Sequence, residues 1–174
     1  MRSREFDQVV LPHLDAAYNY ARWLSRNDTE AEDVVQDACV RAMRFLPSLR
    51  DADARPWLFA IIRNAWYSRA ARRAGSPERL PFDAARYDPL DHAPDPEARL
   101  LRQHAVARIR EALEQLPPDF REVLVLREFE EMSYKEIASV VGVPIGTVMS
   151  RLARARDRLS TLLSSSPLPM ERRR

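Results

Sequence analysis

The clearest hydrophobic pattern lies in residues 133–159, where it predicts two short amphipathic helices joined by a tight turn. Ser133 and Glu136 have the spacing of a capping box, in which both side chains satisfy free backbone N–H groups at a helix start. Gly142 and Pro144 punctuate the turn. The apolar residues of the second helix fall on one narrow, core-facing arc: Ile145, Val148, Leu152, Ala155 and Leu159. This spacing is typical of a helix-turn-helix.

A polar arc runs along the other side of the second helix and carries Thr147, Ser150, Arg151, Arg154 and Arg158. Small hydrogen-bonding side chains followed by arginines suit a helix that enters the major groove of DNA, because arginine reaches guanine edges or phosphates. An ordinary solvated basic face on a helical hairpin is the alternative. The capped start, the turn and the arginine spacing together favour DNA binding.

Hydrophobic periodicity predicts three further helices nearer the N-terminus, at residues 5–25, 30–46 and 57–73. Pro12 is expected to kink the first of them or to mark where it begins. Thr29 and Glu32 resemble a second capping box, and Asp53 can cap the third helix. The expected core positions of the first two helices are Phe6, Val9, Val10, Leu14, Ala17, Ala21 and Leu24, then Ala31, Val34, Val35, Ala38, Ala42, Phe45 and Leu46.

The helix at residues 30–46 carries Asp33, Gln36 and Asp37 on its outer face. Acidic residues in the first turns of a helix compensate its dipole, which is one explanation of the pattern. The other explanation is a docking stripe for a basic or polar helix of a partner. Periodicity alone does not separate the two. A di-metal bundle is not indicated, because the required Glu-x-x-His pair does not occur.

The helix at residues 57–73 has two faces that look buried. One face carries Trp57, Leu58, Ile61, Ile62 and Ala65; the other carries Phe59, Arg63, Trp66 and Tyr67, and the helix ends in Arg69, Arg72 and Arg73. Aromatic rings among arginines suit a platform for single-stranded nucleic acid, because rings stack on unpaired bases and cations follow the backbone. Taken alone, the pattern slightly favours the alternative, in which the rings pack against a neighbouring helix.

Prolines and acids without apolar periodicity fill residues 75–96, which predicts an extended, flexible linker between two helical domains. We therefore expect an all-α fold with a first domain at 1–73, a linker at 74–96, a second domain with the helix-turn-helix at 97–163, and a disordered basic tail at 164–174. In the second domain we expect helices at 96–115 and 119–131. Their expected core residues are Leu101, Ala105, Ile109, Ala112 and Leu116, then Val123, Leu124, Leu126 and Phe129.

The composition fits an all-helical protein, since only three glycines accompany 45% hydrophobic residues. The formal net charge is +2, but residues 145–174 hold seven arginines and two acids, whereas residues 75–100 hold six acids and three arginines. The single cysteine fits a reducing compartment, and no apolar run approaches the roughly 18 residues of a membrane span. No metal-ligand cluster, phosphate loop or catalytic nucleophile can be assembled. We expect a cytoplasmic protein that is not an enzyme, with no cofactor, small-molecule substrate or membrane insertion.

Four stretches in this order resemble the sigma-70 family of bacterial transcription initiation factors, and more narrowly its extracytoplasmic-function (ECF) group: EAEDVVQDACVRAMR, RPWLFAIIRN, LPPDFREVLVLREFEEMSYKEIA and GVPIGTVMSRLARAR. The resemblance covers about residues 5–73 and 97–163. It implies a sigma factor that binds core RNA polymerase, reads the −35 and −10 elements of promoter DNA and assists promoter melting.

The resemblance also implies roles for individual residues. Contact with the clamp helices of the polymerase β′ subunit falls on Asp33, Val34, Gln36, Asp37 and Arg41. Recognition and melting of the −10 element fall on Arg63, Asn64, Trp66, Tyr67, Arg69, Arg72 and Arg73. Recognition of the −35 element falls on Ser133, Tyr134, Lys135, Thr147, Ser150, Arg151, Arg154 and Arg158. Members of the group are commonly held inactive by an anti-sigma factor, which is therefore an expected partner.

Two positions depart from the family pattern. Ser68 stands where an aspartate is frequent, and Met149 stands where many members have a lysine that can contact a phosphate. Two other interpretations remain on the residues alone. A stand-alone helix-turn-helix regulator leaves the acidic stripe and the aromatic helix without a role. A helical interaction protein with no DNA role leaves the arginine spacing unexplained.

Overall fold

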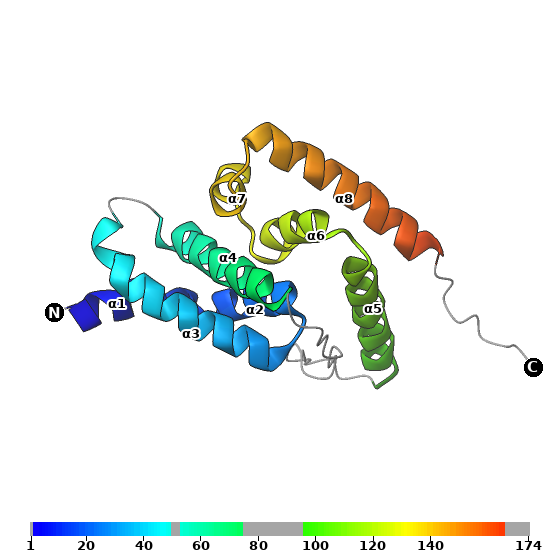
Figure 1. The fold of residues 1–174 in the computed structure, drawn as a ribbon. Helices are drawn as coiled ribbons and strands as arrows, with labels where there is room; N and C mark the ends of the chain where they lie inside the picture. The colour runs from blue at the N-terminus through cyan, green and yellow to red at the C-terminus, as the bar shows by residue number, and fades with distance from the viewer. Residues whose placement is uncertain (1, 50–52, 75–95, 166–174) are drawn as a thin grey trace, which may run out of the picture.

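The computed structural model describes residues 2–49, 53–74 and 96–165, and every regular element in these ranges is helical. The N-terminal unit contains α1 (Arg2–Val10), η1 (Leu11–His13), α2 (Leu14–Ser25), α3 (Asp28–Phe45), η2 (Leu46–Ser48) and α4 (Ala54–Arg73). The C-terminal unit contains α5 (Pro96–Glu114), α6 (Pro118–Leu124), the π-helical turn η3 (Val125–Phe129), α7 (Tyr134–Val141) and α8 (Ile145–Ser165). Figure 1 shows α6 between α8 and the helices of the N-terminal unit, with α5 to the right. The all-α fold of two helical units is as predicted.

The first two predicted helices form; the first is interrupted as expected, and the second needs corrections at its start and at Phe45. Pro12 lies in the 3₁₀ turn η1, which separates α1 from α2 and so produces the expected break. The second helix begins earlier than predicted: Asn27 caps α3, and its side chain accepts a hydrogen bond from the backbone N–H of Glu30 at 3.0 Å. The predicted capping box at Thr29 is therefore wrong, because Asn27 already satisfies this helix start. Phe45, expected in the core, is 52% exposed.

Helix α4 is buried on two faces, as its sequence suggested. Asp53 caps it by accepting from the backbone N–H of Arg55 at 3.1 Å, as predicted. Leu58 and Ile62 lie in the core on one face. Phe59, on the other face, is fully buried and stacks on Tyr20 of α2 with ring centroids 5.0 Å apart. The alternative explanation of the Phe59 ring, packing against a neighbouring helix, is therefore the correct one.

The helix-turn-helix of α7 and α8 has the predicted local geometry. The capping box is complete: the Ser133 side chain accepts from the backbone N–H of Glu136 at 3.2 Å, and the Glu136 carboxylate accepts from the backbone N–H of Ser133 at 2.6 Å. Gly142 ends α7 with φ of +70°, a left-handed conformation in which a side chain is strained. Helix α8 then leaves at an angle of 100° to α7.

Replacing Ser133 with alanine is expected to lower the free energy of unfolding by about 1 kcal/mol, because the first turn of α7 loses its cap. Chemical denaturation monitored by circular dichroism measures this change. Ser139→Ala, on the exposed face of the same helix, is the matched control and should leave the midpoint unchanged. A loss of similar size in both variants would contradict the role of the cap.

Several apolar positions predicted to be buried are exposed in the C-terminal unit. Helix α5 extends beyond the unit, so Leu101 is 63% exposed and Ile109 is 41% exposed; burial on this helix begins only at Ala112. Phe129 and Ile145 are 47% and 45% exposed. The predicted core of α5 is thus wrong at Leu101, Ala105 and Ile109, and right at Ala112 and Leu116; α8 approaches Ala105 and Ile109 across an open groove without burying them.

The two units share one continuous hydrophobic core, in which α7 packs on α4 and η3 contacts α2. The predicted linker between Ala74 and Pro96 lies outside the described residues. The predicted tail also lies outside them, except that Ser164 and Ser165 extend α8. Among the described helices, none is by itself long and apolar enough to cross a membrane; only the bent pair α7 and α8 passes that test of length and composition together.

Candidate nucleic-acid interface

The outward face of α8 presents a short row of exposed side chains at its N-terminal end. Its inner face is anchored by three buried residues, Val148, Leu152 and Ala155. The exposed row consists of Met149, Ser150, Ala153 and Arg154. Among the −35 candidates, Ser150, Arg154 and Arg158 are exposed, Thr147 is half-buried, and Lys135 is exposed on α7. Sequence reasoning missed Ala153, although its spacing of four residues from Met149 already placed both on one face.

Four −35 candidates have side chains engaged within the protein. Ser133 caps α7, and the Ser150 hydroxyl donates to the backbone carbonyl of Thr147 at 3.0 Å. The Arg151 guanidinium forms an ion pair with Asp119 of α6 at 3.0 Å, and its side chain is only 22% exposed. The Tyr134 ring is half-buried and lies under the Arg127 guanidinium, 5.1 Å from its centroid. Arg154, by contrast, has no ion pair or hydrogen bond among the described residues and is exposed. Arg154 is therefore the arginine of α8 best placed to reach a base edge.

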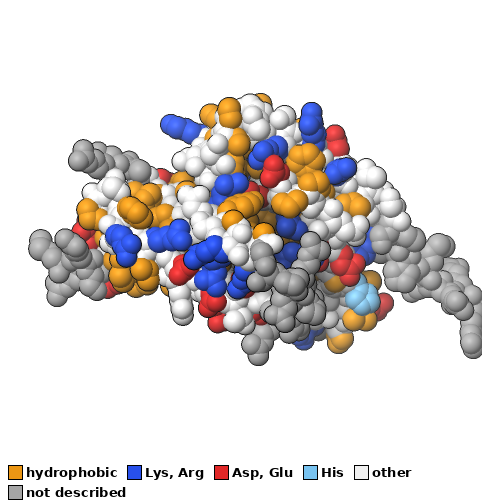
Figure 2. Space-filling view, in the orientation of Figure 1, with side chains coloured by type: hydrophobic (Ala, Val, Ile, Leu, Met, Phe, Trp, Pro, Cys, Tyr) orange, Lys and Arg blue, Asp and Glu red, His pale blue; other side chains and the backbone are white. Residues whose placement is uncertain are grey.

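The basic end of α4 and the acidic side of α3 are bound to each other. The Arg69 guanidinium contacts Asp33 at 2.7 Å and Asp37 at 3.3 Å, and Arg73 pairs with Glu30. Figure 2 shows basic side chains gathered over α3 and α4, with acidic side chains between them. The Asp33 and Asp37 side chains remain 48% and 42% exposed, so both are still accessible to a partner.

The remaining candidates on α3 divide into accessible and inaccessible residues. Gln36 is exposed and Arg41 is half-buried. Val34, predicted to contact the polymerase, is fully buried in the core. Its role as a contact residue is therefore corrected: Val34 holds α3 in the bundle, whereas the neighbouring polar residues face outward.

On α4, Asn64, Tyr67, Arg72 and Arg73 are exposed and Trp66 is half-buried. The Arg63 guanidinium lies over the Tyr67 ring, 4.5 Å from its centroid. Burial raises the pKa of the Tyr67 hydroxyl, and the negative charge of Glu122 raises it further. Ser68, the departure from the family pattern, donates a hydrogen bond to the backbone carbonyl of Asn64 at 2.7 Å.

A buried carboxylate that sequence reasoning missed lies where the two units meet. The Glu122 side chain is 1% exposed. It accepts hydrogen bonds from the Tyr20 hydroxyl at 2.7 Å and from Arg63 Nε at 2.8 Å. Burial and the nearby Glu122 charge raise the pKa of Tyr20 well above its usual value. The available signal was helical periodicity, since Glu122 falls on the same arc as Leu126 and Phe129.

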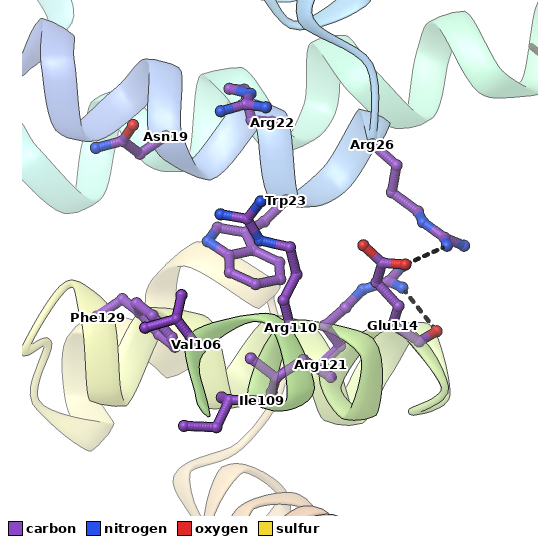
Figure 3. A pocket seen from close by; sticks show the side chains of 11 residues that line it. Asn19, Arg22, Trp23, Arg26, Val106, Ile109, Arg110, Glu114, Arg121 and Phe129 are labelled. Carbon is purple, nitrogen blue, oxygen red and sulfur yellow. Dashed lines mark hydrogen bonds and ion pairs between the residues drawn. The ribbon is translucent and has the colours of Figure 1, made fainter. Parts of the chain in front are cut away.

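Further contacts join the units around Glu122. The Arg55 guanidinium pairs with Glu130 at 2.9 Å, while burial raises the pKa of the Glu130 carboxyl despite that pairing. The Trp23 ring lies 5.4 Å from the Phe129 ring, centroid to centroid. A mainly apolar cavity of about 210 Å³ lies between α2 and α5, and the Arg26–Glu114 ion pair of 3.0 Å lies at its rim. Figure 3 shows the side chains that line it.

Within the ranges that the structure describes, no group of three or more His, Cys, Asp or Glu side chains could hold a metal ion. The C-terminal unit carries a capped helix-turn-helix with the exposed Arg154. The N-terminal unit carries accessible carboxylates on α3 and exposed polar, aromatic and basic side chains on α4. The complete helix-turn-helix with its exposed arginine is typical of a helical DNA-binding protein.

Comparison with known families agrees with this class. The family described as Sigma-70 region 2 matches residues 9–75, and Sigma-70, region 4 matches residues 107–159. The chain belongs to the sigma-70 family, and several of its relatives are named ECF RNA polymerase sigma factors. It is a sigma factor, a transcription initiation factor that directs RNA polymerase to specific promoters.

Two relatives are each 35% identical to the chain. The ECF RNA polymerase sigma factor SigE of Mycolicibacterium smegmatis aligns over 91% of this chain, which spans only 62% of that relative's length. The RNA polymerase sigma-H factor of Pseudomonas aeruginosa aligns over 92% of this chain and over 86% of that relative's length. The solved sigma factor RpoE of Bartonella quintana, in complex with the anti-sigma factor NepR, is 30% identical. It superposes with a TM-score of 0.76 over 94% of this chain and 99% of that chain, which includes both helical units.

Proposed function

We propose that the chain is a non-catalytic specificity subunit in which the C-terminal unit reads the −35 element and the N-terminal unit docks on core RNA polymerase and opens the −10 element. The observation that carries the proposal is the exposed row at the start of α8, the second helix of a complete helix-turn-helix. A helix anchored in this way presents its N-terminal residues to base edges in the major groove. The function places the protein in the cytoplasm, with the polymerase and the chromosome.

The −35 element would be read by a subset of the predicted residues. Arg154 can donate two hydrogen bonds to a guanine, and Ser150 can contact either a base or a phosphate. Met149 lies in the same exposed row and offers an apolar surface in place of a cation. Arg151, held by Asp119, would orient the helix or contact phosphate rather than read a base.

The −10 element would be held by α4. Asn64 and Tyr67 offer hydrogen bonds and a ring, and Arg72 and Arg73 offer positive charge along the strand. Stacking of an unpaired base on an aromatic side chain contributes about 1 to 3 kcal/mol per base, which can bias strand opening without ATP. Trp66 is the second ring candidate, although it is half-buried between the units.

The polymerase would dock on α3 through Asp33, Gln36 and Asp37. These three residues lie on one side of the helix at spacings of three and four, and all are accessible. Their accessible carboxylates suit a basic helical surface such as the clamp helices of the β′ subunit. An anti-sigma factor is a further proposed partner, because the solved relative RpoE is bound to one.

Run-off transcription tests the proposal. Purified core RNA polymerase is given fragmented DNA of the source genome with and without the full chain. We expect discrete transcripts that depend on the chain and share sequence motifs near −35 and −10. Transcripts without a shared upstream motif, or none that depend on the chain, would contradict the proposed function.

A further inference from the structure

Glu122 belongs to the C-terminal unit but takes its hydrogen-bond donors from the N-terminal unit. Its carboxylate accepts from Tyr20 on α2 and from both Nε and Nη2 of Arg63 on α4, at 2.7, 2.8 and 3.3 Å. The side chain is 1% exposed, so these contacts replace its water shell. A buried carboxylate without its partners is strongly unfavourable, and this site therefore depends on the two units staying together.

The pair engages a side chain that promoter DNA would need. Arg63 is one of the residues proposed to hold the −10 strand, yet its guanidinium is 20% exposed and bonded to Glu122 in two places. Burial lowers the pKa of Arg63, but the hydrogen bond and charge of Glu122 outweigh it and leave the pKa raised. Arginine binds carboxylate and phosphate through the same fork of N–H donors. Glu122 therefore takes up the N–H donors of Arg63 that a phosphate of the DNA backbone would otherwise bind.

Other contacts cover the same surface. Helix α7, the first helix of the helix-turn-helix, packs on α4. The Arg55–Glu130 pair and the Trp23–Phe129 contact cross the same boundary through two residues of the C-terminal unit that follow Glu122 in the chain. One face of α4 is thereby closed off by the C-terminal unit, while its polar residues at the far end remain exposed.

Promoter geometry requires this boundary to open. The −35 and −10 elements are about 25 base pairs apart, which is about 85 Å of DNA at the usual rise per base pair. A compact chain of 174 residues has a radius of gyration of about 16 Å and is about 40 Å across. Two units in direct contact cannot reach both elements, whereas the 21 residues from 75 to 95 can span about 70 Å when extended.

We infer that the Glu122–Arg63–Tyr20 contact is an autoinhibitory latch, which holds the free protein closed and keeps Arg63 from DNA until the units separate on core polymerase. The inference rests on the proposed function, because it assigns Arg63 to the −10 strand. The latch couples two events. When Glu122 separates from Tyr20 and Arg63, the C-terminal unit is free to move and the Arg63 guanidinium becomes available to promoter DNA.

Energy transfer between two dyes on the full chain measures the closed state. The labels replace exposed Ser48 in the N-terminal unit and exposed Ser160 in α8, in a Cys39→Ser background. We expect the otherwise unaltered labelled protein to show high transfer when free and low transfer after addition of core polymerase. Glu122→Gln should lower the ratio of closed to open molecules at least tenfold without polymerase, because it leaves the Arg63 charge unpaired at the boundary.

The matched control is Glu128→Gln. Glu128 pairs with Arg156 within the C-terminal unit and is exposed, so the control removes the same charge without touching the boundary. It should keep the transfer of the parent protein. Equal transfer in Glu122→Gln, Glu128→Gln and the parent would overturn the latch.

A second variant covers the case in which Glu122→Gln fails to fold, as judged by circular dichroism. Tyr20→Phe removes one hydroxyl donor and keeps the ring stacked on Phe59. It should lower the closed-to-open ratio severalfold while retaining the helical signal. If Glu122→Gln does not fold and Tyr20→Phe shows the transfer of the parent, the latch is overturned.

Transcription separates failure of the latch from failure of the proposed function. With a promoter recovered by run-off transcription and limiting core polymerase, Glu122→Gln should form open complexes severalfold faster than the parent. A parent that is active and a variant that is no faster contradict the latch alone. A parent that supports no transcription contradicts the proposed function, whatever the dyes report.

Discussion

Replacing both Asp33 and Asp37 with asparagine is expected to weaken binding to core RNA polymerase about ten- to a hundredfold, because two accessible charges are lost from one docking face. Asparagine is preferred to a charge reversal here. Arg69 lies between the two carboxylates at 2.7 and 3.3 Å, so two new cations would repel it and disturb α4. The amide oxygens of asparagine can still accept from Arg69 and keep the helices together. Surface-based binding measurements with immobilised core polymerase give the affinity.

Asp15→Asn is the control for this variant. Asp15 is exposed on α2, away from the face of α3 that carries Asp33, Gln36 and Asp37, so its loss should leave the affinity nearly unchanged. Binding of the double variant should also depend less on salt concentration than that of the parent. An unaltered affinity would mean that α3 is not the docking helix and that its acids serve only Arg69 and the helix dipole.

Arg154→Ala is expected to reduce transcription that depends on the −35 element about tenfold or more, since a bidentate arginine–guanine contact is worth about 1 to 3 kcal/mol. Arg151→Ala should have a smaller effect, because Arg151 is already held by Asp119 at 3.0 Å. This ranking comes from the tertiary structure, as the sequence placed both arginines on the same polar arc. The measurement compares templates with an intact and a scrambled −35 element.

The control for the arginines is Arg156→Ala. Arg156 lies on α8 but is paired with Glu128, and it falls outside the exposed row at the N-terminal end. Its loss should weaken binding little and equally on both templates. If Arg154→Ala lowers both templates to the same extent, Arg154 contacts phosphate and another residue reads the bases.

Local signals in the sequence were enough to predict the helices. The capping box at Ser133, the cap at Asp53, the left-handed Gly142 and the break at Pro12 all lie where they were expected. Each depends on the backbone within a few residues, so it can be inferred without knowing the fold. The one displaced cap, at Asn27 instead of Thr29, differs because two acceptable capping residues stand two positions apart.

The sequence could not determine which apolar and charged residues meet a partner within the fold. Phe45 and Leu101 satisfy helical periodicity and yet are 52% and 63% exposed, because periodicity gives a direction around a helix but not whether another element covers it. Glu122 shows the converse: a charge on an apolar arc is acceptable only because Tyr20 and Arg63 arrive from residues 102 and 59 positions away. By itself the sequence determined the helices, the helix-turn-helix and the family. Only the tertiary structure decided that Arg154 faces outward while Arg151 and Arg63 are held, since ion pairing depends on distances between helices far apart in the chain, which no local pattern encodes.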